Sequence, residues 1–123
     1  MATITPTALI PLRLSFGGTT VGDDDVPVAC TVSGDSFPLI GDYVILTFAT
    51  TGTGATLTFD SVQPSDQGQD TNVTCVMSAT DRTKVVIKCD NRFKQTSGNV
   101  GMVNVTYTSV TGMTVDAKYL VVN

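Results

Sequence analysis

The sequence of 123 residues predicts an all-β fold, and three observations support this prediction. Apolar and polar residues alternate with a period of two in several segments, which is typical of half-buried strands. Turn-forming residues interrupt the chain at intervals of about ten residues. The acidic residues are 11 Asp and no Glu, and Asp concentrates in turns and caps. Seven or eight short strands at this spacing are typical of a single antiparallel β-sandwich, either immunoglobulin-like or jelly-roll-like, or of a closely related barrel.

The individual strands follow from the alternation. The segments expected to be strands are 43–48, 55–59, 71–77, 83–89, 103–108 and 113–121. Segment 43–48 is apolar on both faces, which favours a central strand that is covered on each side. Segments 71–77 and 83–89 are expected to form a hairpin about the turn at residues 79–81. Everything from about Val26 to Val121 is expected to share one core.

The first twelve residues differ from the rest and are predicted to form an extended N-terminal arm before a β-sandwich domain at 13–123. Pro6 and Pro11 exclude a helix, and proline is confined to the edges of sheets. The arm carries four large apolar residues, which are Ile4, Leu9, Ile10 and Leu12. Two interpretations stay open: the arm binds a neighbouring subunit or an exposed sheet edge, or it is a first strand that folds back on its own sandwich.

Composition restricts the class of partner. Charged residues make up 15% of the chain against an average of about 25%, so hydroxyl and amide groups must cover much of the surface, which suits packing against protein. A net charge of -4 with seven Lys and Arg argues against nucleic acid, because each neutralised phosphate needs a basic contact. No apolar run reaches the roughly 20 residues that cross a bilayer, and no secretory signal is visible. We therefore expect no membrane partner and folding in the cytoplasm.

Three cysteines, Cys30, Cys75 and Cys89, are expected to be free, buried thiols. In the expected hairpin, Cys75 and Cys89 are offset by four residues, or roughly 14 Å, which is too far for a disulfide. The spacing of Cys30 and Cys89 is similar to that of the immunoglobulin bridge, but the chain has no Trp and position 87 is Ile where that fold needs Tyr. An odd number of thiols fits a reducing compartment.

Catalytic residues are scarce, so we expect no enzyme and no cofactor. The absence of His excludes an imidazole base, a nucleophile–His dyad and a histidine metal site. Asp60, Asp66 and Asp70 could form a pair of glycosidase carboxylates, but Asp commonly caps turns in sandwich loops. The run Asp23, Asp24 and Asp25 is the candidate metal site, if a loop brings its oxygens together around a hard cation. The alternative is a solvated acidic loop that protects a sheet edge.

Five segments carry a resemblance to a known family. They are Gly34–Gly41, Asp60–Pro64, Gly98–Val100, Val105–Tyr107 and Val110–Val115. Their order, over about residues 3–118, resembles that of the small head proteins of tailed bacteriophages. The resemblance implies a virion structural protein, a capsid decoration (cement) protein on the exterior of the head, assembled in the bacterial host cytoplasm. Its partners would be the major capsid protein and further copies of itself around a capsid symmetry axis.

The resemblance also implies contact residues. Arg92 and Phe93 follow a short turn, as an Arg-Phe pair does in that family, and such a pair is a common protein–protein anchor. The alternative is that Arg92 pairs with Asp90 or Asp70 in its own loop. Phe37 and Pro38, in the loop Gly34–Gly41, are expected to be exposed. The interface candidates are Ile4, Pro6, Leu9, Ile10, Leu12, Phe37, Pro38, Arg92 and Phe93.

Two other functions stay open. Within the virion, the chain could be a neck, tail or fibre-associated subunit of similar fold. From another class, it could be a carbohydrate-binding β-sandwich module, although no Trp and only three Tyr make an aromatic platform for sugars hard to build. Because sandwich folds host many functions, the fold does not decide between these alternatives.

Overall fold

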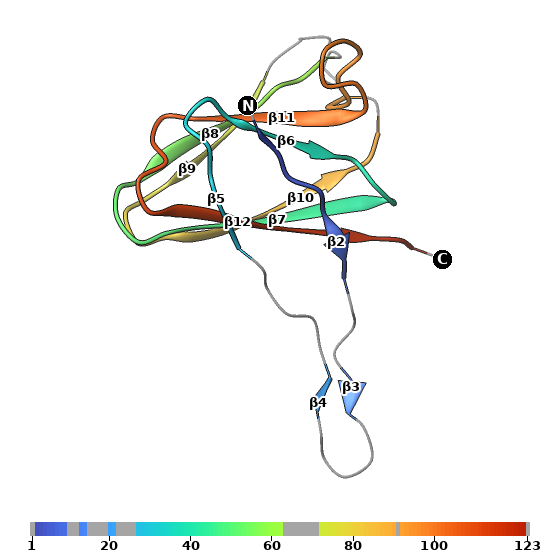
Figure 1. The fold of residues 1–123 in the computed structure, drawn as a ribbon, viewed down its shortest axis with the longest axis horizontal. Helices are drawn as coiled ribbons and strands as arrows, with labels where there is room; N and C mark the ends of the chain where they lie inside the picture. The colour runs from blue at the N-terminus through green and yellow to red at the C-terminus, as the bar shows by residue number, and fades with distance from the viewer. Residues whose placement is uncertain are drawn as a thin grey trace.

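A computed structural model of the chain describes residues 2–9, 13–14, 20–21, 27–62, 72–90 and 92–122. These residues form strands and contain no helix, so the fold is all-β as predicted (Figure 1). One five-stranded sheet has the order β1 (Ala2–Thr3), β6 (Asp35–Pro38), β11 (Met102–Tyr107), β8 (Ala55–Phe59) and β9 (Val73–Met77). We call it the first sheet.

The second sheet has the order β10 (Arg82–Lys88), β7 (Tyr43–Thr50), β12 (Met113–Leu120) and β2 (Thr7–Ala8), with β5 (Val28–Ala29) also paired to β12. A separate two-stranded ladder joins β3 (Arg13–Leu14) to β4 (Thr20–Val21). The longer strands pair antiparallel, whereas β1 joins β6 and β2 joins β12 in parallel. Both five-stranded sheets are therefore mixed.

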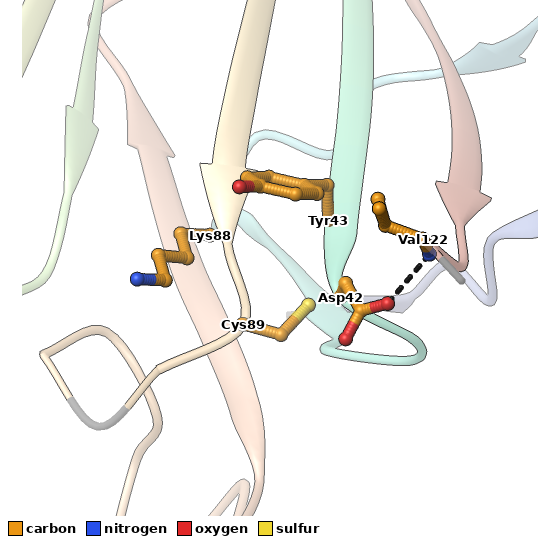
Figure 2. A pocket seen from close by; sticks show the side chains of 5 residues that line it. All are labelled: Asp42, Tyr43, Lys88, Cys89 and Val122. Atoms are coloured by element: carbon orange, nitrogen blue, oxygen red, sulfur yellow. Dashed lines mark hydrogen bonds between the residues drawn. The ribbon is translucent and has the colours of Figure 1, made fainter.

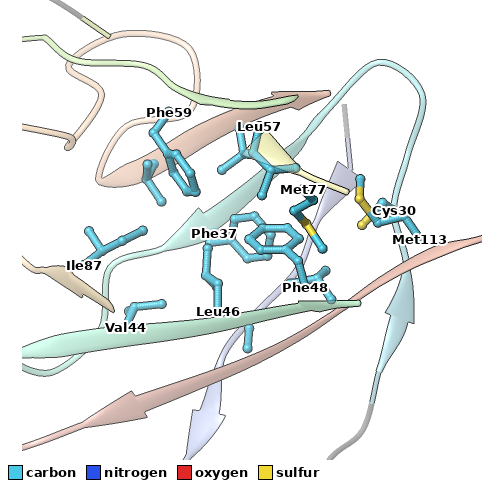
Figure 3. Packing of buried hydrophobic residues seen from close by; sticks show 14 of the residues in the cluster. Cys30, Phe37, Val44, Leu46, Phe48, Leu57, Phe59, Met77, Ile87 and Met113 are labelled. Atoms are coloured by element: carbon cyan, nitrogen blue, oxygen red, sulfur yellow. The ribbon is translucent and has the colours of Figure 1, made fainter. Parts of the chain in front are cut away.

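The two sheets bury a common hydrophobic core between them (Figure 3). Phe48 of the second sheet lies at its centre. Its ring meets Phe37 and Phe59 of the first sheet edge to face, with centroids 6.5 Å and 6.4 Å apart. Alternation explains the arrangement: along β7 and β8 every second residue is buried and the residues between them are partly exposed.

The expected exposure of Phe37 is wrong. Phe37 is fully buried, because residues 35–38 form strand β6 in place of a loop and turn the ring into the core. Pro38 ends this strand opposite Met102 and is partly buried. Proline is tolerated here since β6 is short and ends at this residue.

The expected hairpin at 71–89 is also wrong. Strand β9 pairs with β8 in the first sheet, whereas β10 pairs with β7 in the second. The connection at residues 78–81 therefore crosses from one sheet to the other. It contains Thr80 with a φ of 61°, and the Asp81 N–H donates to the Ser78 carbonyl across 3.2 Å.

The described part of the arm lies on this chain's own sheets. The Ile4 N–H donates to the Ser36 carbonyl at 2.9 Å, and the Leu9 N–H donates to the Tyr119 carbonyl at 2.9 Å. Between these bonds the arm passes from the first sheet to the second. Pro6 is buried at the crossing, and Ile4 packs partly buried against the core. Residues 2–9 thus adopt the second of the two arrangements considered for the arm.

The free cysteines are confirmed, although not all are buried. Cys30 is buried, whereas Cys75 and Cys89 are partly exposed at the rim of the core. The outward face of β12 is a further departure from the expected alternation, because Asp116 and Lys118 are both buried. The Lys118 Nζ and the Asp116 Oδ1 lie 2.9 Å apart, so each charge offsets the cost of burying the other.

Candidate interaction surface

One end of the molecule gathers the ends of three strands of the second sheet. Tyr43 at the start of β7 is the register partner of both Lys88 and Leu120, the last residues of β10 and β12. The chain reaches β7 through a turn at Gly41, which has a φ of +71°. A Cβ at this position would come 2.9 Å from the Leu120 carbonyl oxygen, so the turn requires glycine.

Asp42 holds this end of the second sheet together. Its N–H donates to the Leu120 carbonyl at 2.9 Å, and its own carbonyl accepts the Cys89 N–H at 2.9 Å. Its carboxylate Oδ2 accepts the Val122 N–H at 2.6 Å. One residue thus ties the ends of β10 and β12 to the start of β7.

A pocket of about 290 Å³ opens beside Asp42 (Figure 2). Its lining residues are Asp42, Tyr43, Lys88, Cys89 and Val122. The Cys89 thiol donates to the Ile40 carbonyl across 3.5 Å. Desolvation by burial raises the pKa of this thiol, so it stays protonated at neutral pH and is a poor nucleophile. The pocket offers the side chains of Lys88 and Tyr43 for contact.

Exposed apolar side chains lie around this end of the fold. Val121 and Val122, which follow β12, are 54% and 59% exposed. Leu9 is 36% exposed and is held beside β12 by its bond to Tyr119. We call Leu9, Val121, Val122 and the pocket the end surface. Exposed apolar side chains with a few charged neighbours are typical of protein contact sites.

Arg92 and Phe93 are held in the loop after β10. The Arg92 N–H donates to the Asp90 Oδ1 at 3.1 Å, and its carbonyl accepts the Val62 N–H at 2.8 Å. The guanidinium lies 5.2 Å from the centroid of the Phe93 ring, which packs partly buried against the core. Both side chains remain partly exposed. The loop thus presents a fixed cation–π pair.

A second, smaller pocket lies on the outward face of the second sheet. It has a volume of about 110 Å³ and is lined by Pro27, Thr47, Ala49, Arg82, Thr114 and Asp116. Asp116, its acidic residue, is already paired with Lys118. This pocket therefore offers no free charge pair for chemistry.

A buried polar cluster joins the start of β6 to β11 inside the fold. Asp35 is fully buried, and its Oδ2 accepts the Thr31 N–H at 3.1 Å and the Tyr107 hydroxyl at 2.8 Å. Beside it, burial raises the pKa of Cys30 to about 11. Burial likewise raises the pKa of Tyr107 well above its usual value. Both groups remain protonated at neutral pH, so the cluster is structural.

The structure separates the sequence-predicted contact residues into three groups. Phe37, Pro6 and Ile4 contribute to this chain's own fold, as described above. Leu9, Pro38, Arg92 and Phe93 are partly or largely exposed. Ile10 and Leu12, with the metal candidates Asp23, Asp24 and Asp25, lie outside the described residues.

Sequence reasoning did not find the pocket. Tyr43, Lys88 and Val121 are interpreted from the sequence only as residues of expected strands. The sequence feature that points to this place is Gly41, which directly precedes Asp42 and the long strand β7. It indicates a tight turn, but not which other strands end beside it.

Comparison with known proteins gives no relative. No family model matches the chain, and neither does a curated protein or a solved structure. Over the described ranges, no group of three His, Cys, Asp or Glu side chains could hold a metal ion. No helix among the same residues is long and apolar enough to cross a membrane. The fold and the end surface together describe an all-β protein that exposes apolar side chains at one end.

Proposed function

We propose that this chain is a virion structural protein, a capsid decoration protein that binds the exterior of an assembled phage head. The order of turn and strand segments, which resembles that of small phage head proteins, motivates the proposal. The observation that carries it is the end surface, where Leu9, Val121 and Val122 are exposed around a pocket. Apolar side chains of this kind are costly to leave in water and favour burial against protein.

The mechanism is adhesion. Each bound copy buries surface on neighbouring subunits of the major capsid protein, and contact with two subunits at once opposes their separation. Copies around a symmetry axis of the shell add to the effect, because each supplies a further bridge. The free energy of disassembly rises, and the shell withstands the internal pressure of packaged DNA.

The fixed loop at Arg92 and Phe93 supports the same role. Arg and aromatic residues are enriched at the energetic centres of protein interfaces. Arg92 loses little conformational entropy on binding, because the Phe93 ring and the Asp90 carboxylate already hold it in place.

A binding experiment with undecorated capsids tests the proposal. Purified protein is mixed with capsids that lack it, and bound copies per particle are counted after sedimentation. We expect hundreds of copies and a higher temperature of capsid disruption. A handful of copies would indicate a neck, tail or fibre position, and no binding would overturn the decoration role.

A pair of variants tests the end surface. The double variant Leu9→Asp with Val121→Asp should reduce occupancy strongly, because two carboxylates would have to be desolvated at the interface. Val32→Asp is the matched control, since Val32 is 80% exposed near the start of β6, away from the end surface. Equal occupancy for both proteins would place the contact elsewhere. Circular dichroism of each variant confirms that it is folded.

A further inference from the structure

Strand β9 forms an open edge of the first sheet. The Thr108 N–H donates to the Thr56 carbonyl at 3.2 Å, and the Asp60 N–H donates to the Asn104 carbonyl at 3.0 Å. Even-numbered residues of β8 therefore turn their main-chain groups to β11, and odd-numbered residues turn theirs to β9. Because Leu57 is the register partner of Cys75, it is Thr74 and Val76 that direct their N–H and C=O groups away from β8. Among the described residues, no strand pairs with that side of β9.

Charged residues or short length protect the other edges of the two sheets against the addition of a further strand. Strand β9 has neither feature. Strand β10, at the edge of the second sheet, presents Arg82, Lys84 and Lys88 as exposed basic residues. The strands on the opposite side, β1, β2 and β5, are only two residues long. Strand β9 has five residues with no charge, no proline and no glycine, and its Val76 is 74% exposed. Charged and short edges prevent strand addition, whereas a longer uncharged edge favours it.

We propose that β9 pairs with β9 of a second copy of this chain, antiparallel about a two-fold axis at Cys75. In this register Cys75 faces the partner's Cys75. Thr74 faces the partner's Val76, and these residues exchange the main-chain hydrogen bonds that are open in a single copy. The two first sheets then form one continuous sheet.

The edge suits pairing with a copy of itself in charge and in residue type. Residues 72–78 contain no charged side chain, so no like charges meet although the chain carries a net charge of -4. Thr74 and Val76 are both β-branched, and such residues pair well across strands. The outward face behind them is uncharged too, because Thr74 lies opposite Thr58, and Thr58 opposite Thr106. A segment of another protein with acidic or basic residues would lack this match.

Cys75 gives the pairing a chemical test. Residues that face each other without exchanging hydrogen bonds in an antiparallel pair have Cα atoms about 4.5 Å apart. That separation lies within the range that a disulfide spans. The oxidant diamide can therefore link the two thiols. It takes up the two electrons and two protons that the thiols lose as the S–S bond forms. Cys75 is partly exposed on this edge, whereas Cys30 is buried and Cys89 lies beside the pocket.

The experiment uses the full chain in solution. Sedimentation at rising protein concentration should show a dimer, and diamide should link the native protein into a covalent dimer on a non-reducing gel. The link should disappear in Cys75→Ser and persist in Cys89→Ser. Val76→Lys should raise the concentration needed for dimerisation at least about tenfold, because it places a lysine on the edge. Val86→Lys is the control, since Val86 is 57% exposed on the edge strand β10.

Two results would overturn the proposal: a chain that stays monomeric at its highest soluble concentration with no link through Cys75, or a dimer that Val76→Lys leaves unchanged. The inference does not rest on the decoration role. A monomer that decorates capsids would refute the pairing alone, and a dimer that fails to bind capsids would refute the decoration alone.

Discussion

At the scale of single residues, Asp35 is a fully buried charged group that links two parts of the fold. Its Oδ2 accepts two hydrogen bonds, from the Thr31 N–H and the Tyr107 hydroxyl, while its Oδ1 is buried with no hydrogen-bond partner. The carboxylate thereby joins the turn before β6 to a strand 72 positions later in the chain. Replacement of this residue tests how much that link stabilises the fold.

We predict that Asp35→Ala lowers the free energy of unfolding by about 2–4 kcal/mol, because two partly buried donors, the Thr31 N–H and the Tyr107 hydroxyl, lose their acceptor. Asp35→Asn should cost less, since its amide oxygen can accept the same two bonds. Urea unfolding of the three proteins measures the difference. If Asn costs as much as Ala, the stabilisation depends on the charge of the carboxylate and not on its hydrogen bonds.

Cys30 makes stability depend on alkaline pH. Burial raises the pKa of its thiol from 9.0 to about 11. The unfolded chain loses this proton above pH 9, whereas the folded chain keeps it until about pH 11, so the folded state binds more protons in this window. The contribution of the protonated Cys30 thiol to the free energy of unfolding is complete below pH 9 and is lost as the pH rises through about 11. The raised pKa of Tyr107 acts in the same direction at higher pH.

The melting temperature should therefore fall between pH 9 and pH 11, and it should fall less in Cys30→Ala. Scanning calorimetry of both proteins from neutral pH upward measures this. Samples returned to neutral pH serve as the control for irreversible damage. An equally steep fall in the variant would assign the effect to other groups.

At the scale of elements, the arm is tied to both sheets. The Ala2, Ile4 and Leu9 N–H groups donate main-chain hydrogen bonds to the sheets, in addition to the pairing of β1 with β6 and of β2 with β12. Pro6 is buried and Ile4 is partly buried. Because the arm pairs with β6 and with β12, it also closes two strand edges that would otherwise be open.

Deletion of residues 2–9 should lower the free energy of unfolding by about 4–5 kcal/mol, at about 1 kcal/mol for each hydrogen bond donated by Ala2, Ile4 and Leu9 and 1–2 kcal/mol for the apolar burial. Thr5→Ala, at an exposed position of the arm, is the control and should change stability by less than about 0.5 kcal/mol. Chemical denaturation measures both. A deletion variant as stable as the full chain would show that the arm adds nothing to folding.

Local sequence pattern predicted some elements well. Segment 55–59 was expected as a strand and β8 has the same bounds, because Ala55, Leu57 and Phe59 alternate strictly with two threonines. Strand β6 was not predicted. Asp35, Ser36 and Pro38 favour turns. They form a strand because β6 pairs with β11, which is distant in the sequence, and because Phe37 is buried in the core.

The connection between β9 and β10 and the pocket were missed for the same reason. A period of two indicates a strand, but it does not indicate which sheet the strand joins. Strand β9 pairs with β8 and β10 with β7, so the partner strands decide where each one lies. The pocket depends on three strand ends meeting at Asp42, which no single segment specifies.

At the scale of the whole molecule, the two sheets depend on one core. The ring of Phe48, on the second sheet, meets three aromatic rings of the first: Phe37, Phe59 and Tyr107, the last with centroids 6.1 Å apart. The arm and the connection at 78–81 also join one sheet to the other. Neither sheet has a second core of its own among the described residues. We therefore expect the sheets to unfold together.

Phe48→Ala tests this cooperativity. Removing the ring leaves a cavity between the sheets and should lower the free energy of unfolding by about 3–5 kcal/mol. Hydrogen exchange should show the same loss of protection in peptides from β7 and from β8, although the substitution lies in β7 alone. Phe93→Ala, at the rim of the core, is the control and should cost less. If β7 loses protection while β8 keeps it, the two sheets unfold separately.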